Sequence, residues 1–143
     1  MDGTVVASGT LPSFIYESVK FGDSVLHRIE VTGPINLAVR IPLYKKTLET
    51  AHSSDYFCIL DNRAGYENTF SYADMAELDT MLIQAGIRNF YGATVSTDPY
   101  YTALVKLAQS NMELSELGGE LLATNDYEEA EEFIMARLHS DHK

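Results

Sequence analysis

Cysteine is scarce in this chain: Cys58 is the only one, so no intramolecular disulfide can form. A chain without disulfides suits a reducing compartment, and we expect a cytoplasmic location. Cys58 lies within an apolar run, residues 56–60. A thiol in such a run is typical of a small core residue, and a catalytic thiol is the less favoured alternative.

Basic residues are also scarce. Ten Lys and Arg stand against 21 Asp and Glu, which gives a formal net charge of -11. A field of this sign repels phosphate backbones and anionic lipid surfaces, so nucleic acid is not expected as a partner. The same charge would suit a basic protein partner.

Long apolar runs are missing. No segment approaches the roughly 20 apolar residues of a membrane span, so none is expected. The first residues lack a basic region followed by an apolar stretch, and no signal peptide is expected. There is no internal repeat, and 143 residues suit one domain, residues 1–143.

Motifs for catalysis and metal binding are absent too. The sequence has no HExxH pattern and no paired cysteines, and it lacks a nucleophile elbow and a glycine-rich phosphate loop. Gly118-Gly119 predicts only a turn. The histidines show no ligand spacing: they are His27, His52, His139 and His142. We therefore predict no catalytic residue, no metal site and no cofactor.

The front of the chain is predicted to be extended. Two partly alternating runs, residues 11–20 and 25–32, are separated by residues with turn chemistry, which predicts an antiparallel hairpin. Apolar residues then recur at helical spacing, at Leu37, Ile41, Tyr44 and Leu48. This spacing predicts a helix from Ile35 to about His52, kinked at Pro42.

Three strand–helix units follow. Their strands are predicted over residues 56–60, 89–95 and 121–123. Each helix has a start signal: Ser71 with a capping box to Asp74, Asp98 before Pro99, and Asp126. The predicted inward faces are Met75, Leu78, Leu82 and Ala85, then Tyr101, Leu104, Val105, Ala108 and Met112, then Ala130, Phe133, Ile134 and Leu138. This order predicts an α/β fold with a mixed, mostly parallel sheet and about four helices.

The element order, with three local features, resembles the SpoIIAA-like proteins. The features are Ile41-Pro42-Leu43 in the first helix, a strand that ends in Asp61, and an acidic final helix over residues 127–138. SpoIIAA-like proteins are small bacterial domains with the STAS fold (sulfate transporter and anti-sigma-factor antagonist), structurally akin to lipid-binding CRAL-TRIO domains. The resemblance implies a STAS-type sandwich.

The same resemblance implies a non-enzymatic regulatory or protein-interaction domain. STAS antagonists bind an anti-sigma kinase, which switches them off by phosphorylating a Ser or Thr in an Asp-Ser-Ser/Thr-Gly motif. That motif is absent here; Ser71 is the nearest positional match for the phosphate acceptor and Thr69 the next. By analogy with CRAL-TRIO domains, the alternative is a binding module for a small apolar or lipid-like ligand. A homodimer is a further state that the sequence leaves open.

The loop after the strand that ends in Asp61 is the main candidate site, because ligands of open α/β sheets bind at this edge. Asp61, Asn62 and Arg63 could hold a polar ligand, with Arg63 as a planar donor fork. We favour the alternative that Arg63 pairs with Asp61 or a nearby acid, since surface ion pairs are abundant. Asp61, Asp98 and Asp126 could together hold Mg²⁺, but helix capping accounts for the last two.

Tyrosine is abundant, with nine residues. Four of them are predicted near the same edge: Tyr66, Tyr72, Tyr100 and Tyr101. They could line a pocket for an apolar ligand, although half-buried packing is the favoured interpretation. A deep apolar cavity under the second helix would favour ligand binding, and a closed interior would favour the interaction domain.

Overall fold

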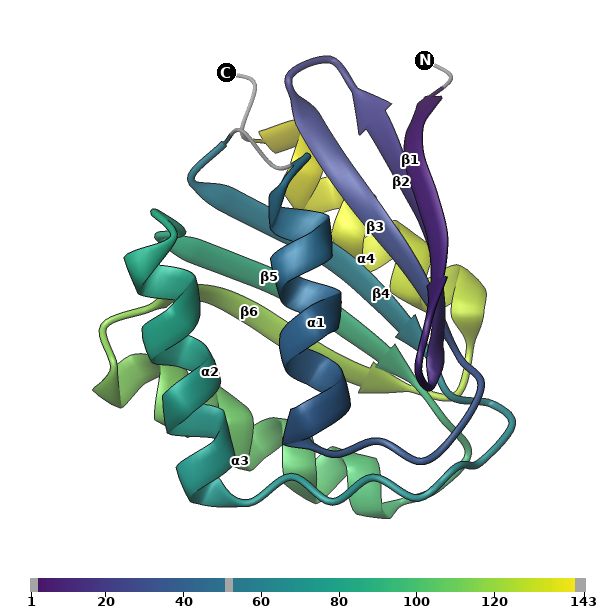
Figure 1. The fold of residues 1–143 in the computed structure, drawn as a ribbon, viewed down its shortest axis with the longest axis vertical. Helices are drawn as coiled ribbons and strands as arrows, with labels where there is room; N and C mark the ends of the chain where they lie inside the picture. The colour runs from purple at the N-terminus through teal and green to yellow at the C-terminus, as the bar shows by residue number, and fades with distance from the viewer. Residues whose placement is uncertain (1–2, 51–52, 141–143) are drawn as a thin grey trace.

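The computed structural model describes residues 3–50 and 53–140. His52 and His142, which the sequence analysis singled out, lie outside the described residues. Six strands form one sheet in chain order (Figure 1). They are β1 (Thr4–Leu11), β2 (Phe14–Phe21), β3 (Ser24–Val31), β4 (Asp55–Asp61), β5 (Asn89–Val95) and β6 (Gly118–Thr124). β1 to β3 pair antiparallel and β3 to β6 pair parallel, so the fold is α/β with a mixed sheet.

Four helices cover the two faces of this sheet. α1 (Leu37–Leu48), α2 (Tyr72–Gln84) and α3 (Tyr100–Leu114) lie over one face, and α4 (Tyr127–Ser140) lies over the other (Figure 1). Among the described residues, no helix is both long enough and apolar enough to cross a membrane.

The predicted hairpin is confirmed as β2 and β3, and residues 89–95 form a strand with the predicted bounds. β1 was not predicted, because most of its residues are exposed and leave little apolar alternation to detect. The turn predicted at Gly118-Gly119 is wrong, since both residues belong to β6. A Cβ at Gly119 would lie 2.0 Å from the carbonyl oxygen of Phe90, so this pairing needs a glycine.

The starts of α2, α3 and α4 follow the predicted chemistry, with a small shift for α3, whereas the cap of α1 was not predicted. Asn36 caps α1 by accepting a hydrogen bond from the Val39 amide at 3.1 Å, and Pro42 lies inside the helix without ending it. α3 begins one residue later than predicted, and the Asp98 carboxylate accepts from the Tyr100 amide at 2.9 Å. Ala85, predicted to face the core, is exposed.

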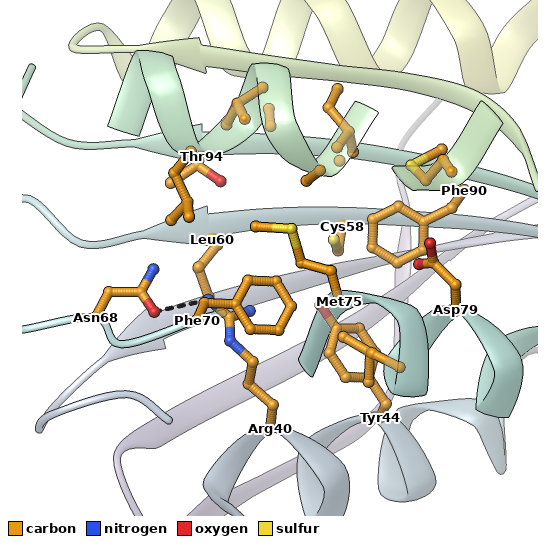
Figure 2. A pocket seen from close by; sticks show the side chains of 18 of the residues that line it. Arg40, Tyr44, Cys58, Leu60, Asn68, Phe70, Met75, Asp79, Phe90 and Thr94 are labelled. Carbon is orange, nitrogen blue, oxygen red and sulfur yellow. Dashed lines mark hydrogen bonds between the residues drawn. The ribbon is translucent and has the colours of Figure 1, made fainter. Parts of the chain in front are cut away.

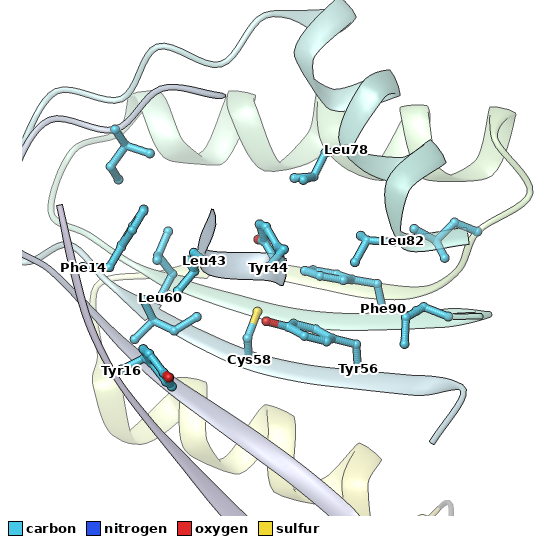
Figure 3. Close-up of a cluster of buried hydrophobic side chains, with 14 of the residues drawn as sticks. Phe14, Tyr16, Leu43, Tyr44, Tyr56, Cys58, Leu60, Leu78, Leu82 and Phe90 are labelled. Carbon is cyan, nitrogen blue, oxygen red and sulfur yellow. The ribbon is translucent and has the colours of Figure 1, made fainter. Parts of the chain in front are cut away.

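The larger core lies between the sheet and α1 and α2 (Figure 3). An aromatic stack runs across three strands in this core: His27 lies 4.7 Å from Tyr56 and Tyr56 lies 5.1 Å from Phe90, measured between ring centroids. Burial lowers the pKa of His27 to about 4, so this histidine is neutral. Cys58 lies in the same core, and burial raises the pKa of its thiol to about 12.

Candidate functional site

The loop after β4 begins with an ion pair between its first candidate residues. Arg63 donates to Asp61 through Nε at 2.9 Å and through Nη2 at 2.6 Å. These hydrogen bonds from Arg63 hold the pKa of Asp61 below its usual value. The guanidinium also lies 5.0 Å from the ring centroid of Tyr127. The donor fork of Arg63 is thus already occupied by a carboxylate of its own loop.

Asn62 holds this loop together. It is fully buried, and its Nδ2 donates to the Tyr66 carbonyl at 2.9 Å and to the Tyr101 hydroxyl at 2.6 Å. Its Oδ1 accepts from the Tyr66 amide at 3.0 Å. All three contacts are internal to the protein, so Asn62 fixes the course of the loop and presents no group to a ligand.

The two candidate phosphate acceptors lie further along the same loop. The Thr69 hydroxyl donates to the Ile35 carbonyl at 3.3 Å. Ser71 is exposed and caps α2, where its Oγ accepts from the Asp74 amide at 3.1 Å while Asp74 accepts from the Ser71 amide at 3.2 Å. The capping box predicted from the sequence is therefore present.

The four candidate tyrosines do not form one pocket. Tyr66, Tyr72 and Tyr100 are exposed, and only Tyr101 is buried. The described residues also contain no cluster of three His, Cys, Asp or Glu side chains placed to hold a metal ion. Asp126, like Asp98, accepts a hydrogen bond at a helix start, from the Glu128 amide at 3.0 Å.

A cavity of about 90 Å³ lies under α2, between the sheet and helices α1, α2 and α3 (Figure 2). Most of its wall is apolar and includes Leu60, Phe70, Met75, Leu104, Ala108 and Met112. Gly92 of β5 contributes to the space, because a Cβ there would lie 2.9 Å from the Phe90 ring and 3.4 Å from the Cys58 sulfur.

Two buried polar side chains, Arg40 and Asn68, meet in the wall of this cavity. Arg40 is 5% exposed and Asn68 is 7% exposed. An isolated bridge between Ile35 and Asn68 ties the loop after β4 to the start of α1, and this contact brings Asn68 to Arg40. Arg40 Nη2 donates to Asn68 Oδ1 at 3.1 Å, and the guanidinium lies 4.2 Å from the ring centroid of Phe70 (Figure 2).

A third buried polar group, Asp79 of α2, also lines the cavity. It is 7% exposed, and in Figure 2 it lies beside Phe90, away from Arg40 and Asn68. Burial raises the pKa of Asp79 to about 6. A hydrogen bond from Ser115 acts in the opposite direction and only partly offsets this rise. Its Oδ2 has no hydrogen-bond partner among the described residues.

Sequence reasoning did not single out these three residues, although two of them carried a signal. Arg40 lies three residues after Leu37 and four before Tyr44, so it shares their helix face. Asp79 lies four residues after Met75 and three before Leu82, on the inward face of α2. A charged residue on an apolar helix face is the pattern that could have revealed both. Asn68, within a loop, gave no such signal.

Comparisons of this chain with protein-family models, with curated proteins and with solved structures found no match in any of the three.

Proposed function

We propose that this protein is a binding module for a small, mostly apolar ligand, which occupies the cavity under α2. The cavity is the observation that carries the proposal. An empty space in a core costs stability at roughly 24 cal/mol per Å³. For a volume of about 90 Å³ this amounts to about 2 kcal/mol. A ligand that filled the space would recover part of that cost.

The size of the cavity restricts the ligand. Its volume of about 90 Å³ is below the roughly 150 Å³ of an engineered cavity that binds benzene. The apolar body therefore has only a few carbon atoms, unless flexible side chains such as Met75 and Met112 move aside. The resemblance to SpoIIAA-like domains, themselves akin to lipid-binding CRAL-TRIO domains, agrees with an apolar ligand.

The test uses methyl NMR of ¹³C-labelled methionine with a neutral probe, butyramide. Met75 and Met112 line the cavity, while Met135 packs on the opposite face of the sheet and serves as an internal reference. We expect saturable shifts at Met75 and Met112 and none at Met135. An absence of shifts at the two cavity methionines, with butyramide and with its charged counterpart butyrate alike, would overturn the proposal.

A matched pair of variants locates the binding. Ala108→Leu on α3 fills the cavity, and Ala103→Leu makes the same change at an exposed position of that helix. Binding should be lost in Ala108→Leu and unchanged in Ala103→Leu. Equal binding by both variants would place the probe elsewhere.

The second candidate is a regulatory or protein-interaction domain of the SpoIIAA-like type, with the start of α2 as its surface. Its support is that Ser71 is exposed and that Tyr72 beside it is 45% exposed. A phosphate on Ser71 would lie at the positive end of the helix, which tolerates the added charge.

Two substitutions at Ser71 separate capping from regulation. Ser71→Ala should lose about 1 kcal/mol of stability and keep its partner. Ser71→Asp should fold almost as well as the wild type and lose any partner that docks on α2. Melting curves and a pull-down from host lysate measure the two effects. If both variants recover the same proteins as the wild type, Ser71 serves only as a cap.

A further inference from the structure

Arg40 is a buried cation, and the groups that contact it among the described residues are neutral. Its hydrogen bond goes to the amide oxygen of Asn68, and its face lies against the Phe70 ring. It also interacts with the Tyr44 hydroxyl. Burial raises the pKa of that hydroxyl, and the nearby charge of Arg40 opposes the rise. The ion pairs of the described residues do not include Arg40. Buried charges in proteins are normally paired, because an unpaired one costs several kcal/mol.

Hydrogen-bond donors remain unused at this point of the wall. Arg40 Nε and Asn68 Nδ2 are both buried and have no acceptor among the described residues. The two side chains are hydrogen-bonded to each other, so the unused donors belong to one small group of atoms. Two neighbouring donors, one of them on a cation, call for an acceptor that carries negative charge.

From this geometry we infer that the ligand is a carboxylate: its head pairs with Arg40 and Asn68, and its short apolar body fills the cavity. This inference rests on the proposed function and adds the chemical class of the ligand. A planar carboxylate matches the donor fork of a guanidinium. A dianionic phosphate would need more positive charge, and Arg40 is the only basic side chain among the described residues that line the cavity.

The size of the cavity also limits the acid. The cavity of about 90 Å³ is smaller than the roughly 150 Å³ cavity that binds benzene, so it has room for fewer carbon atoms than that ring contains. An acid with three or so carbon atoms beyond its carboxylate is therefore the expected class. Butyrate is a suitable probe, and butyramide has nearly the same shape without the charge.

The experiment titrates butyrate and butyramide separately into the protein and follows the methyl signals of Met75 and Met112. Butyrate should bind the wild type about tenfold more tightly than butyramide, or better, because its carboxylate pairs with Arg40 charge to charge and offers two oxygens to the guanidinium, whereas butyramide offers one neutral carbonyl oxygen. Sodium chloride at equal concentration controls for a simple anion. In Arg40→Met the preference for butyrate should disappear, while the control Arg88→Met, at an exposed position, should retain it.

The outcomes separate the two proposals. Equal affinity for butyrate and butyramide in the wild type would overturn the inference that the ligand is a carboxylate. The proposal of a small apolar ligand would remain. The same methyl shifts from chloride as from butyrate would also overturn it. Binding of neither probe would overturn the proposed function itself. The wild-type comparison decides the matter even if Arg40→Met fails to fold.

Discussion

Arg63 and Arg40 are the same kind of side chain in two different settings. Arg63 lies on the surface and makes a two-pronged contact with Asp61, and solvent reaches 54% of its side chain. Arg40 is 5% exposed and contacts an amide and aromatic side chains. Water and Asp61 both stabilise the first charge, whereas the second has no counter-ion within the described part of the chain.

This difference agrees with the interpretation favoured from the sequence, that Arg63 forms an ion pair, and it draws attention to Arg40, which the sequence analysis did not single out. Arg63 was the candidate because it lies in a loop at the ligand-binding edge of an α/β sheet. Its charge is compensated, however, and an exposed pair contributes little free energy. The uncompensated groups lie inside the protein, where an unmet polar atom is costly. A functional site is therefore better sought at the interior cavity than at the loop.

The largest expected effect concerns the reactivity of Cys58 in the cavity wall. Its thiol pKa rises from 9.0 to about 12, through burial and despite the opposing influence of Arg40. The native protein should thus hold about a thousandfold less thiolate than an ordinary cysteine, and a bulky reagent cannot reach the sulfur. Labelling with dithionitrobenzoate should be negligible in the native state and complete in denaturant. Rapid native labelling would show that this interior is open to solvent.

The next effect is the pH dependence that Asp79 imposes. Its pKa is raised from 3.8 to about 6, so the folded state holds the proton more tightly than the unfolded state. Stability from this group is greatest below pH 3.8 and falls as the pH rises to about 6. The loss approaches about 3 kcal/mol, at roughly 1.36 kcal/mol per unit of pKa.

Asp79→Asn should remove this fall. The unfolding free energy of the variant, measured with urea from pH 4 to pH 7, should vary less with pH than that of the wild type. Asp23→Asn, at an exposed turn position, is the control and should keep the wild-type profile. Identical profiles for Asp79→Asn and the wild type would mean that Asp79 is not held in a protonated form.

A smaller effect tests the contact between Arg40 and Asn68. Arg40→Met alone leaves the buried amide oxygen of Asn68 without its donor. The double variant Arg40→Met/Asn68→Leu replaces both polar partners with apolar groups of similar size. It should exceed the single variant in stability by about 1–3 kcal/mol and should match or exceed the wild type. Urea unfolding measures all three proteins. A double variant clearly less stable than the wild type would show that the contact between Arg40 and Asn68 serves to stabilise the fold.

The fold was more predictable from the sequence than the site. Ser71 and Asp126 act through neighbouring backbone amides, so a local pattern suffices to find their caps. β1 was missed because it has little apolar pattern of its own. Its pairing with β2 is what defines it as a strand. The cavity depends on how three helices and three strands meet, and Asn68 reaches Arg40 only through a contact 28 positions away in sequence. Such long-range contacts leave no local periodicity.

The smallest expected effect is at Arg63, the other side of the comparison. The pKa of Asp61 is lowered by the hydrogen bonds from Arg63, so the pair stabilises the fold at neutral pH and loses this contribution as the pH falls below the usual carboxylate value of 3.8. Arg63 is largely exposed, however, and solvent screens the interaction. Arg63→Met should therefore cost less than about 1 kcal/mol at neutral pH. High salt should shrink the difference further, which urea unfolding at two salt concentrations would reveal.

A loss that exceeded about 2 kcal/mol and did not respond to salt would mean that the loop pair is held as firmly as a buried one. The contrast between Arg63 and Arg40 would then no longer separate a surface contact from a binding site.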